Sequence, residues 1–568
     1  MMTRLLVLAS LLILVGAVAS SAATIVIVNL DGPSEGFNDP TPASPVGGNT
    51  GTTIGEQRLI VFEAAAAIWG GLLPSAVTIR VESRFSPQSC DATSAVLGSA
   101  GPNDVFRDFA GAEIAGTWYH VALANKLAGV DLAPGSNDIS ATFNSSIDNN
   151  NNCLQGTNWY YGLDGNEGTD VELLPVVLHE LGHGLGFSTL VSLGTGGEFL
   201  GFPDRYETFI RDNSNGLNWD QMSNAQRLNS ATNTSNVVWD GPTVTALADD
   251  FLGGTPVMTV NNPPPPALPS TIPIGTATFG PSLSETGVTG DIVLVDDGTG
   301  TTSDACEPIT NGAQVAGNIA LIDRGTCTFV SKAQAAQAVG AIAVVIANNV
   351  AGSTPITLGG TDPTITIPVV SITLEDGNAI KAELGTGVNV TLQLDANDLA
   401  GADTSNRVQL YAPSPVEFGS SISHWDVEAL PNLLMEPAIS DDLSSDVDLT
   451  MAHFDDLGWV EVPTGIADRR LPEPRFEELT LLPSYPNPFN PGTTIRYTVS
   501  ETQAIRLAIY DVSGRLVRTL VDRVETAGIH EVTWQGHDHA GRAAASGIYF
   551  VRLAGEGKTA TSKIVLTK

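Results

Sequence analysis

The segment HELGHGLGF, residues 179–187, restricts the fold of this chain more than any other part of its sequence. Residues four apart lie on one side of a helix, so His179 and His183 would point their imidazole rings the same way. The preceding residues VELLPVVL are apolar enough for a buried helix, in which two polar rings gain nothing without a partner. Neutral imidazoles at this spacing suit Zn²⁺, which accepts nitrogen ligands. The segment therefore predicts a buried, metal-binding helix.

Two positions compete for the start of this helix. Thr169 and Glu172 have the spacing of a capping box, which would begin the helix just after Thr169. Pro175 fits best in a first turn and would move the start to Leu174. Both alternatives keep the two histidines inside the helix.

Glu180 follows the first histidine and can reach a zinc-bound water without itself binding the metal. A carboxylate in that place can take a proton from the water and later give it to a leaving amine. This is the general base and acid role in peptide hydrolysis, so Glu180 is the expected catalytic residue.

A catalytic zinc normally has three protein ligands and a water, so one ligand is still missing. The segment resembles the metzincin metalloproteases, whose motif continues to a glycine that turns the chain and then to a third histidine or an aspartate. Gly186 matches the turn, but Thr189 stands where the third ligand would be. The resemblance implies an α+β metzincin-like catalytic domain.

Leishmanolysin-like proteases, one metzincin family, have an insertion at this point. Their third histidine lies far downstream, in a His-Trp-acid motif that precedes a methionine turn. The segment SHWDVEALPNLLMEP, residues 423–437, resembles that motif. The resemblance implies that His424 is the third zinc ligand and that Met435 lies in the turn beneath the metal. It covers about 55–260 and 400–460 and is strong only at the two motifs.

Other third ligands and other cations stay open. Glu198 and Glu207 follow His183 at distances at which thermolysin-like enzymes place a glutamate ligand. His120 and His453 are also available, but no methionine turn follows them, so we expect structural or supporting roles. Calcium is a second candidate cation at DGPSEGFND or DGNEGTD, although such loops are more often solvated turns.

The N-terminal residues have the layout of a secretory signal. Arg4 precedes an apolar run, and small residues between Ala19 and Ala23 offer a cleavage site. A retained membrane anchor is the alternative, but the run is short for a bilayer span. We expect a secreted protein without a transmembrane segment after signal removal.

Charge and cysteine content agree with export. The chain has 62 acidic and 26 basic residues, a formal net charge of −36 that repels nucleic acid and favours solubility. Four cysteines in an exported chain favour two disulfides. Of the three connectivities, we favour neighbouring pairs: Cys90 with Cys153, and Cys306 with Cys327.

A compact α/β module follows a proline-rich junction at 258–275. GNIALIDRG, FVSKAQAAQAVG and AIAVVIANN are typical of a strand, a helix and a strand. The module resembles the protease-associated (PA) domain at 323–329, Lys332 and Gly340. That resemblance implies a β-rich insert with a disulfide between Cys306 and Cys327. Its implied role is substrate recognition or gating, and a simple spacer is equally open.

Short alternating strands separated by turns predict a C-terminal antiparallel β-sandwich. SYPNPFNPGTTIRYTV, YDVSGRLVRTL and ASGIYFVRL resemble C-terminal sorting domains of Gram-negative bacteria, which are similar to the immunoglobulin-like fold of flagellar hook-capping proteins. The resemblance implies the type IX secretion machinery as a partner, and secretion or a cell-surface location in such a bacterium. We expect Ile548 and Phe550 on the core face. A carbohydrate-binding or adhesive sandwich is the alternative, but no aromatic platform is evident.

We therefore predict a multidomain zinc metalloendopeptidase that acts on proteins or peptides. A non-catalytic adhesion or binding protein on a metalloprotease scaffold is the alternative; its decayed site would not retain stoichiometric zinc. The expected parts are a signal peptide at 1–23, the catalytic domain at 24–259 and 399–462, an inserted PA domain at 260–398, a linker at 463–478 and an immunoglobulin-like domain at 479–568.

Overall fold

The computed structural model describes residues 22–460 and 480–566, with internal gaps at 264–266, 299, 353, 440–442, 444–446, 482–491, 500–502, 512–514, 526–527, 540–541 and 556–557. The chain divides into two compact units, Met1–Thr208 with Leu443–Lys568, and Phe209–Asp442. Nearly all of the expected signal peptide and the whole expected linker lie outside the described residues.

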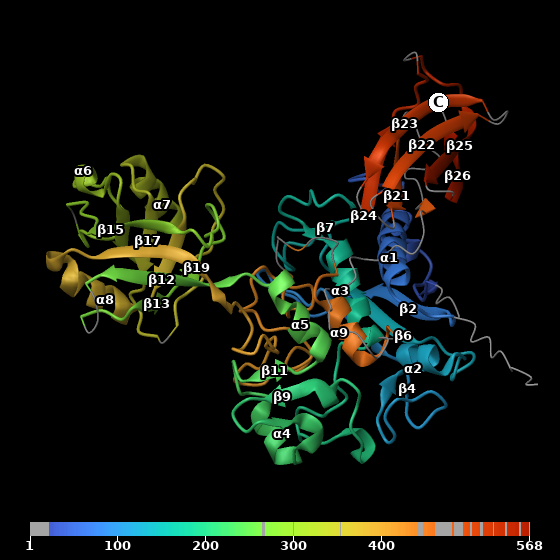
Figure 1. Cartoon of the computed structure of the whole chain (residues 1–568), viewed down its shortest axis with the longest axis horizontal. Coiled ribbons are helices and arrows are strands. Elements are labelled where there is room, and N and C mark those ends of the chain that lie inside the picture. The colour runs from blue at the N-terminus through green and yellow to red at the C-terminus, as the bar shows by residue number, and fades with distance from the viewer. Residues whose placement is uncertain are drawn as a thin grey trace, which may run out of the picture. The chain divides into compact units, whose positions relative to one another are not determined.

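A four-stranded sheet in the order β1-β2-β6-β3 is the centre of the N-terminal part. Its strands β2 and β6 are labelled in Figure 1. Its first three strands are parallel, and β3 is antiparallel to β6 at one edge. α1 packs on β1, and α3 packs on β6 and β3. The bounds are β1 (Ile25–Asn29), α1 (Ile54–Leu72), β2 (Ile79–Ser86), β3 (Gly98–Pro102), β6 (Ile139–Asn144) and α3 (Leu173–Leu185).

Four phenylalanines fill the space between α1 and this sheet, and their rings meet mainly edge to face.

Smaller elements complete the N-terminal part. They are β4 (Val105–Phe106), β5 (Tyr119–His120), α2 (Val121–Ala128), β7 (Trp159–Tyr160) and β8 (Val171–Glu172). Helix α9 (Thr450–Leu457), much later in the sequence, belongs to the same unit. The expected strand at ATIVIVNL and the expected helix at EQRLIVFEAAAAIWGGLL are both confirmed.

The helix that carries HELGHGL begins at Leu173, so the capping-box prediction was wrong. Val171 and Glu172 pair with β7 as strand β8, which keeps the chain extended up to the helix. Glu172 is the N-cap residue, without a side-chain cap, and Pro175 lies in the first turn.

The second unit begins with a three-stranded sheet in the order β10-β9-β11. In the chain, α4 precedes β11 and α5 follows it. The polypeptide after residue 400 returns to this sheet, because Gln409 pairs with Val238 and Leu410 pairs with Trp425. The bounds are β9 (Ile210–Asp212), β10 (Leu217–Asn218), α4 (Asn224–Ser230), β11 (Val237–Trp239) and α5 (Pro242–Phe251).

An eight-stranded sheet follows, in the order β13-β12-β19-β15-β16-β17-β18-β14. β12 spans the position at which we expected the insert to begin, and it pairs with β19 at the expected end. The bounds are β12 (Gly254–Asn262), β13 (Thr271–Pro273), β14 (Gly275–Thr276), β15 (Val288–Leu294), α6 (Gly312–Val315), β16 (Ile319–Asp323), α7 (Phe329–Ala338), β17 (Ala343–Ala347), β18 (Val369–Ile372), α8 (Leu374–Glu383) and β19 (Asn389–Leu399).

Two apolar cores lie on opposite faces of this sheet. Ile380 of α8 belongs to one core, and Ala333 and Ala336 of α7 belong to the other. Parallel strands covered on both faces read as continuous apolar runs, as AVVIA in β17 does. The predicted strand, helix and strand are confirmed as β16, α7 and β17.

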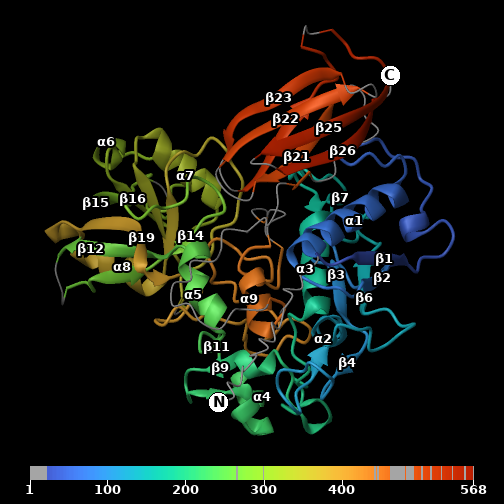
Figure 2. The same ribbon diagram turned by 45° about the vertical axis from the view of Figure 1, so that its right-hand side comes forward.

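The C-terminal part consists of two antiparallel sheets, β20-β21-β24 and β23-β22-β25-β26. The strands of the second sheet are labelled in Figure 2. Tyr549 is buried in the common core of the two sheets whereas Phe550 is 37% exposed, so our prediction for the core face was wrong at Phe550. The bounds are β20 (Thr480–Leu481), β21 (Thr493–Val499), β22 (Gln503–Asp511), β23 (Leu516–Glu525), β24 (Gly528–Trp534), β25 (Gly547–Gly555) and β26 (Lys558–Leu566).

Both favoured disulfides are present: Cys90 is bonded to Cys153, and Cys306 to Cys327. Among the described residues, every helix is too short or too polar to cross a bilayer.

Candidate metal centre

Helix α3 buries all three chemically active side chains of HELGHGL. His179, Glu180 and His183 are each 7–8% exposed. The helix lies very close to β6, because a methyl group at Gly184 would be 2.4 Å from Ile139 Cγ2. Glycine at 184 therefore lets α3 sit directly on the sheet, which holds the histidine side of the helix in place.

Two indoles fix α3 from neighbouring segments of the same unit. Trp69 of α1 donates its Nε1 hydrogen to the Leu178 carbonyl at 3.0 Å. Trp459, just after α9, donates to the Leu185 carbonyl at 3.0 Å. Both carbonyls flank the two histidines in the chain, so these bonds restrict movement of the helix where its ligands lie.

Gly186 ends the helix and turns the chain. Its φ of +141° lies in the region that favours glycine, and its N–H donates to the Gly182 carbonyl. A methyl group there would be 2.9 Å from Leu457 Cδ1. After the turn, Thr189 donates its hydroxyl hydrogen to Asp204 Oδ2 at 2.8 Å. Thr189 thus holds a carboxylate where the shorter metzincin motif has a metal ligand.

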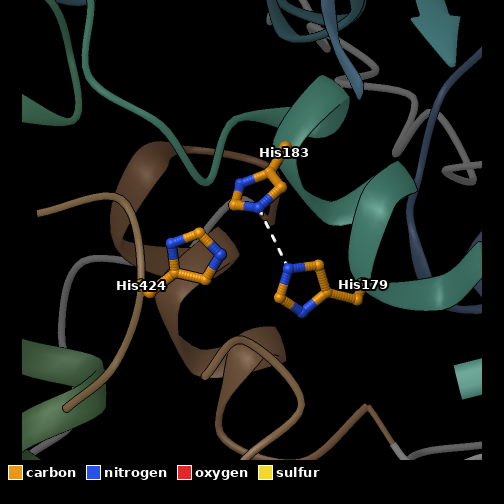
Figure 3. A group of neighbouring side chains, drawn as sticks. All are labelled: His179, His183 and His424. Carbon is orange, nitrogen blue, oxygen red and sulfur yellow. Dashed lines mark hydrogen bonds between the residues drawn. The ribbon is translucent and has the colours of Figure 1, made fainter. Parts of the chain in front are cut away.

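His179, His183 and His424 form one group of metal-ligand type (Figure 3). One nitrogen from each ring lies within 4.8 Å of the others. The Nε2 atoms of His179 and His183 are 3.1 Å apart. Nitrogen ligands placed tetrahedrally 2.0–2.1 Å from zinc are about 3.3 Å apart, so this donor set fits Zn²⁺.

Backbone carbonyls orient two of these rings. Nδ1 of His183 lies 2.7 Å from the Phe187 carbonyl, and Nδ1 of His424 lies 2.7 Å from the Ser420 carbonyl. Each Nδ1 can therefore donate its hydrogen, which leaves the Nε2 lone pair for a metal. Burial lowers the pKa of His183 to about 4, so its ring is neutral at pH 7, the form that binds metal.

Met435 and His424 lie in neighbouring backbone segments of the second unit. Trp425 donates its backbone N–H to the Met435 carbonyl at 2.8 Å, and Tyr411 donates to the His424 carbonyl at 2.9 Å. Met435 is fully buried. HWD and LLMEP are therefore tied together by their backbones, although the sequence separates them.

Glu180 faces the edge strand β3. Ala100 donates its backbone N–H to the Glu180 carboxylate, and burial raises the pKa of Glu180 to about 8. A methyl group at Gly98 would lie 2.9 Å from Glu180 Cγ and 3.0 Å from Oε1. We did not identify Gly98 or Ala100 from the sequence, in which GSAGP is the only hint of a strand whose small residues admit a neighbour.

Glu198 and Glu207 lie outside the histidine group. Within the described ranges, neither glutamate belongs to any set of three metal-ligand side chains. Glu207 is buried and exchanges hydrogen bonds with Asp204: the Asp204 N–H donates to Glu207 Oε2, and the Glu207 N–H donates to Asp204 Oδ1.

His120 and His453 are buried beside the end of α3. The His453 ring stacks on Phe187 with centroids 4.1 Å apart. Burial lowers the pKa of His120 to about 4 and that of His453 well below its usual value. Both rings are therefore neutral packing groups at pH 7.

A second group of metal-ligand type lies in the eight-stranded-sheet domain. It consists of Asp297, Asp304 and Glu307. The ammonium of Lys332, whose side chain is fully buried, attracts all three carboxylates and donates to the Asp304 carbonyl. The lysine thus supplies the positive charge that these carboxylates need.

The two loops proposed for calcium use their carboxylates in other ways. Asp31 accepts hydrogen bonds from the N–H groups of Phe37 and Phe85. Asp164 accepts one from the Tyr160 hydroxyl at 2.5 Å. Within the part of the chain that the structure describes, neither loop contributes to a group of three metal ligands.

Two family models match parts of the chain: the PA domain at 284–380 and the FlgD Ig-like domain at 491–558. The protein is therefore a multidomain chain with a PA domain and an immunoglobulin-like C-terminal domain.

Peptidases are among the curated proteins similar to this chain. A probable leucine aminopeptidase 2 from Aspergillus fumigatus is 33% identical over 143 residues, which are 22% of this chain and 28% of that protein. The minor extracellular protease Vpr from Bacillus subtilis is 31% identical over 121 residues, 21% of this chain and 14% of that protein. The chain thus spans less than a third of either relative.

Solved structures match over similarly short parts. A zinc aminopeptidase from Bacillus subtilis has 25% identity and a TM-score of 0.20, with 27% of this chain and 36% of that chain covered. FlgD from P. aeruginosa has 20% identity and a TM-score of 0.12, with 13% of this chain and 60% of that chain covered.

Proposed function

We propose that the protein is a secreted zinc endopeptidase of the metzincin type that resembles leishmanolysin. His179, His183 and His424 hold the metal, and Glu180 is the general base and acid. The convergence of three buried histidine nitrogens within 4.8 Å carries the proposal, because rings from distant parts of the sequence gain nothing by clustering without a cation.

A bound Zn²⁺ would supply Lewis acidity toward the scissile carbonyl and the attacking water. The chain's own contribution is positioning. Glu180 lies one residue from a ligand and next to β3, so its carboxylate can accept a proton from a water between it and the histidines and deliver it to the leaving amine. A cation among the histidines also favours the ionised carboxylate and opposes the effect of burial on the Glu180 pKa.

The edge of β3 offers a place for the substrate backbone. β3 ends the four-stranded sheet among the described residues, and an edge strand presents N–H and C=O groups to an extended peptide. A peptide paired there would pass beside Glu180.

The PA domain and the immunoglobulin-like domain have separate roles in this proposal. The PA domain, within the insert that we place at 260–398, recognises substrate or controls its access to the 24–259 and 399–462 catalytic parts. The immunoglobulin-like domain at 479–568 directs export by the type IX route in a Gram-negative-type bacterium. The relatives named as peptidases, one of them an extracellular protease, support a proteolytic role outside the cell.

The decisive experiment combines metal analysis with cleavage. Purified protein should contain about one zinc and cleave casein as well as N-acetylated peptides at internal bonds, which an aminopeptidase cannot do. Glu180→Gln should keep the zinc and lose more than 99% of the activity, since general acid–base groups typically contribute 10²–10⁴-fold. Full activity of Glu180→Gln, or protein without zinc, would overturn the proposal and favour a binding protein.

The third ligand is tested separately. His424→Ala should lose stoichiometric zinc, whereas Glu207→Gln should keep it. The opposite pattern would support the thermolysin-like arrangement. Anomalous scattering at the zinc edge would locate the metal directly.

A further inference from the structure

A hollow of about 370 Å³ lies directly beyond the end of β3. Pro102, the last residue of that strand, forms one wall. Most of the residues that line the hollow are apolar, and its one carboxylate, that of Asp104, is exposed. The other lining residues are Asn103, Val105, Trp118, Leu190 and Phe199.

The aromatic wall is held by backbone and side-chain bonds. Trp118 donates its backbone N–H to the Pro203 carbonyl and accepts from the Arg205 N–H, both at 2.8 Å. Its indole donates to the Phe199 carbonyl at 2.9 Å, and the two rings meet edge to face with centroids 5.6 Å apart. The loop with Phe199 is thus fixed to Trp118, so the hollow is preformed.

The opposite wall belongs to the segment that continues from the zinc motif. Leu190 donates its backbone N–H to Asp204 Oδ2, the same oxygen that accepts from Thr189. Asp204 is next to Pro203 in the loop that pairs with Trp118. The carboxylate therefore joins the segment after α3 to the aromatic loop and fixes the width of the hollow.

The loop at 199–203 exposes several large apolar side chains. Phe199, Leu200 and Phe202 are 43%, 72% and 36% exposed. Leu200 has a φ of +51°, which costs a branched residue conformational energy. The Arg107 guanidinium stacks on Phe202 at 3.6 Å from the ring centre. Contiguous exposed apolar side chains beside a hollow are typical of binding surfaces.

We propose that this hollow binds a bulky apolar side chain of the substrate, on the N-terminal side of the bond that is cleaved. The inference rests on the proposed endopeptidase function. β3 runs from Gly98, which lies against Glu180, to Pro102 at the hollow. A peptide paired antiparallel to β3 would therefore enter at the hollow and run toward Glu180.

Strand geometry sets the position of that side chain. Four residue steps separate Gly98 from Pro102 on β3, and at a rise of about 3.4 Å per residue they span about 14 Å. The hollow therefore accepts the side chain four or five residues before the cleaved bond. Apolar walls on both sides favour Phe or Leu there over a basic side chain, for which the exposed Asp104 alone would provide an opposite charge.

The test uses N-acetylated peptides that differ only at these two positions, with Phe, Leu, Arg or Ser. For the wild-type full chain, kcat/KM should be roughly tenfold to hundredfold higher for Phe or Leu than for Ser, the range expected for burying one such side chain. Phe199→Ser should reduce that ratio to below about threefold. Val130→Ser, which changes a 58% exposed side chain outside the hollow, should leave the ratio unchanged.

Binding to the Glu180→Gln protein, measured by calorimetry with the same peptides, supplies a readout that needs no turnover. The Phe peptide should bind roughly tenfold or more tightly than the Ser peptide, and Phe199→Ser should remove the difference. Equal binding of all four peptides, a preference for Arg, or a preference that survives Phe199→Ser would overturn this inference. None of these results would affect the proposed function, which fails only through the zinc and Glu180 experiments.

Discussion

Gly98 on β3 lies so close to Glu180 on α3 that a methyl group at position 98 would be 2.9 Å from Glu180 Cγ. Gly98→Ala should therefore push the carboxylate away from its place and lower kcat by tenfold or more, because small displacements of a catalytic group are costly. The histidines are not touched, so zinc content should stay at the wild-type level. Steady-state kinetics and metal analysis of the same preparation measure both effects.

Gly71, in helix α1, is the control because it lies outside the proposed substrate-binding strand. A methyl group there would have no neighbour within 4 Å. Gly71→Ala should keep kcat within about twofold. If Gly98→Ala were equally harmless, the contact with Glu180 would have no catalytic importance.

Arg58 of α1 is the centre of a buried polar network. Its guanidinium bonds to Asp148 Oδ2 at 3.0 Å and to the Tyr161 hydroxyl at 2.9 Å. Arg58→Met would leave the Asp148 carboxylate without its cation, and breaking such a buried pair costs about 3–5 kcal/mol. Urea denaturation followed by tryptophan fluorescence should show this loss.

Arg84 on β2 gives the comparison, because its side chain is exposed. Arg84→Met should change the free energy of unfolding by about 0.5 kcal/mol or less. A similar loss for both variants would mean that the Arg58 network contributes no more than surface charge.

The sequence was sufficient wherever the signal is local. The apolar run with HELGHGL predicts α3, and the even number of cysteines in an exported chain leads to the two disulfides. The strand-helix-strand pattern of 317–349 is also local and is found as β16, α7 and β17.

Long-range pairing decides the features that sequence reasoning missed. Glu172 cannot act in a capping box with Thr169 because Val171 and Glu172 pair with β7. Adjacent aromatic residues on β25 alternate between faces, and nothing local shows that Tyr549 is the one covered by the other sheet. The hollow at β3 combines Trp118 with Phe199, which no motif connects.

His120 should make stability depend on pH. Burial lowers its pKa from 6.5 to about 4, with a further contribution from His183. Between pH 6.5 and 4 the unfolded chain binds a proton that the folded chain does not, so this stabilisation is complete above pH 6.5 and is lost as the pH falls toward 4. The loss is on the order of 3 kcal/mol. Thermal unfolding of wild type and His120→Gln in EDTA should show a shallower pH slope for the variant, and parallel slopes would contradict the assignment.

Lys332 of α7 should stabilise the PA domain through the four carboxylates that its ammonium attracts, those of Asp304, Asp297, Asp323 and Glu307. Lys332→Met would remove a fully buried positive charge from this group. We expect a loss of about 3–5 kcal/mol in chemical denaturation. Lys381→Met, which removes a partly exposed ion pair with Asp323, should cost less. A wild-type domain whose melting temperature rises with added calcium would show that the lysine does not satisfy this group.

Thr189 should contribute to stability through its hydrogen bond to Asp204 and should not affect zinc binding. Its hydroxyl donates to Asp204, a carboxylate whose pKa is raised by burial and which also accepts from Leu190 and Glu207. Thr189→Val removes one of these donors while leaving the shape of the side chain, so the free energy of unfolding should fall by about 1–3 kcal/mol. Thr189→Ser should restore it, and zinc content should be the same in all three proteins. If Thr189→Val lost its zinc and Thr189→Ser kept it, the position after the glycine turn would belong to the metal site after all, and His424 would not be needed to complete it.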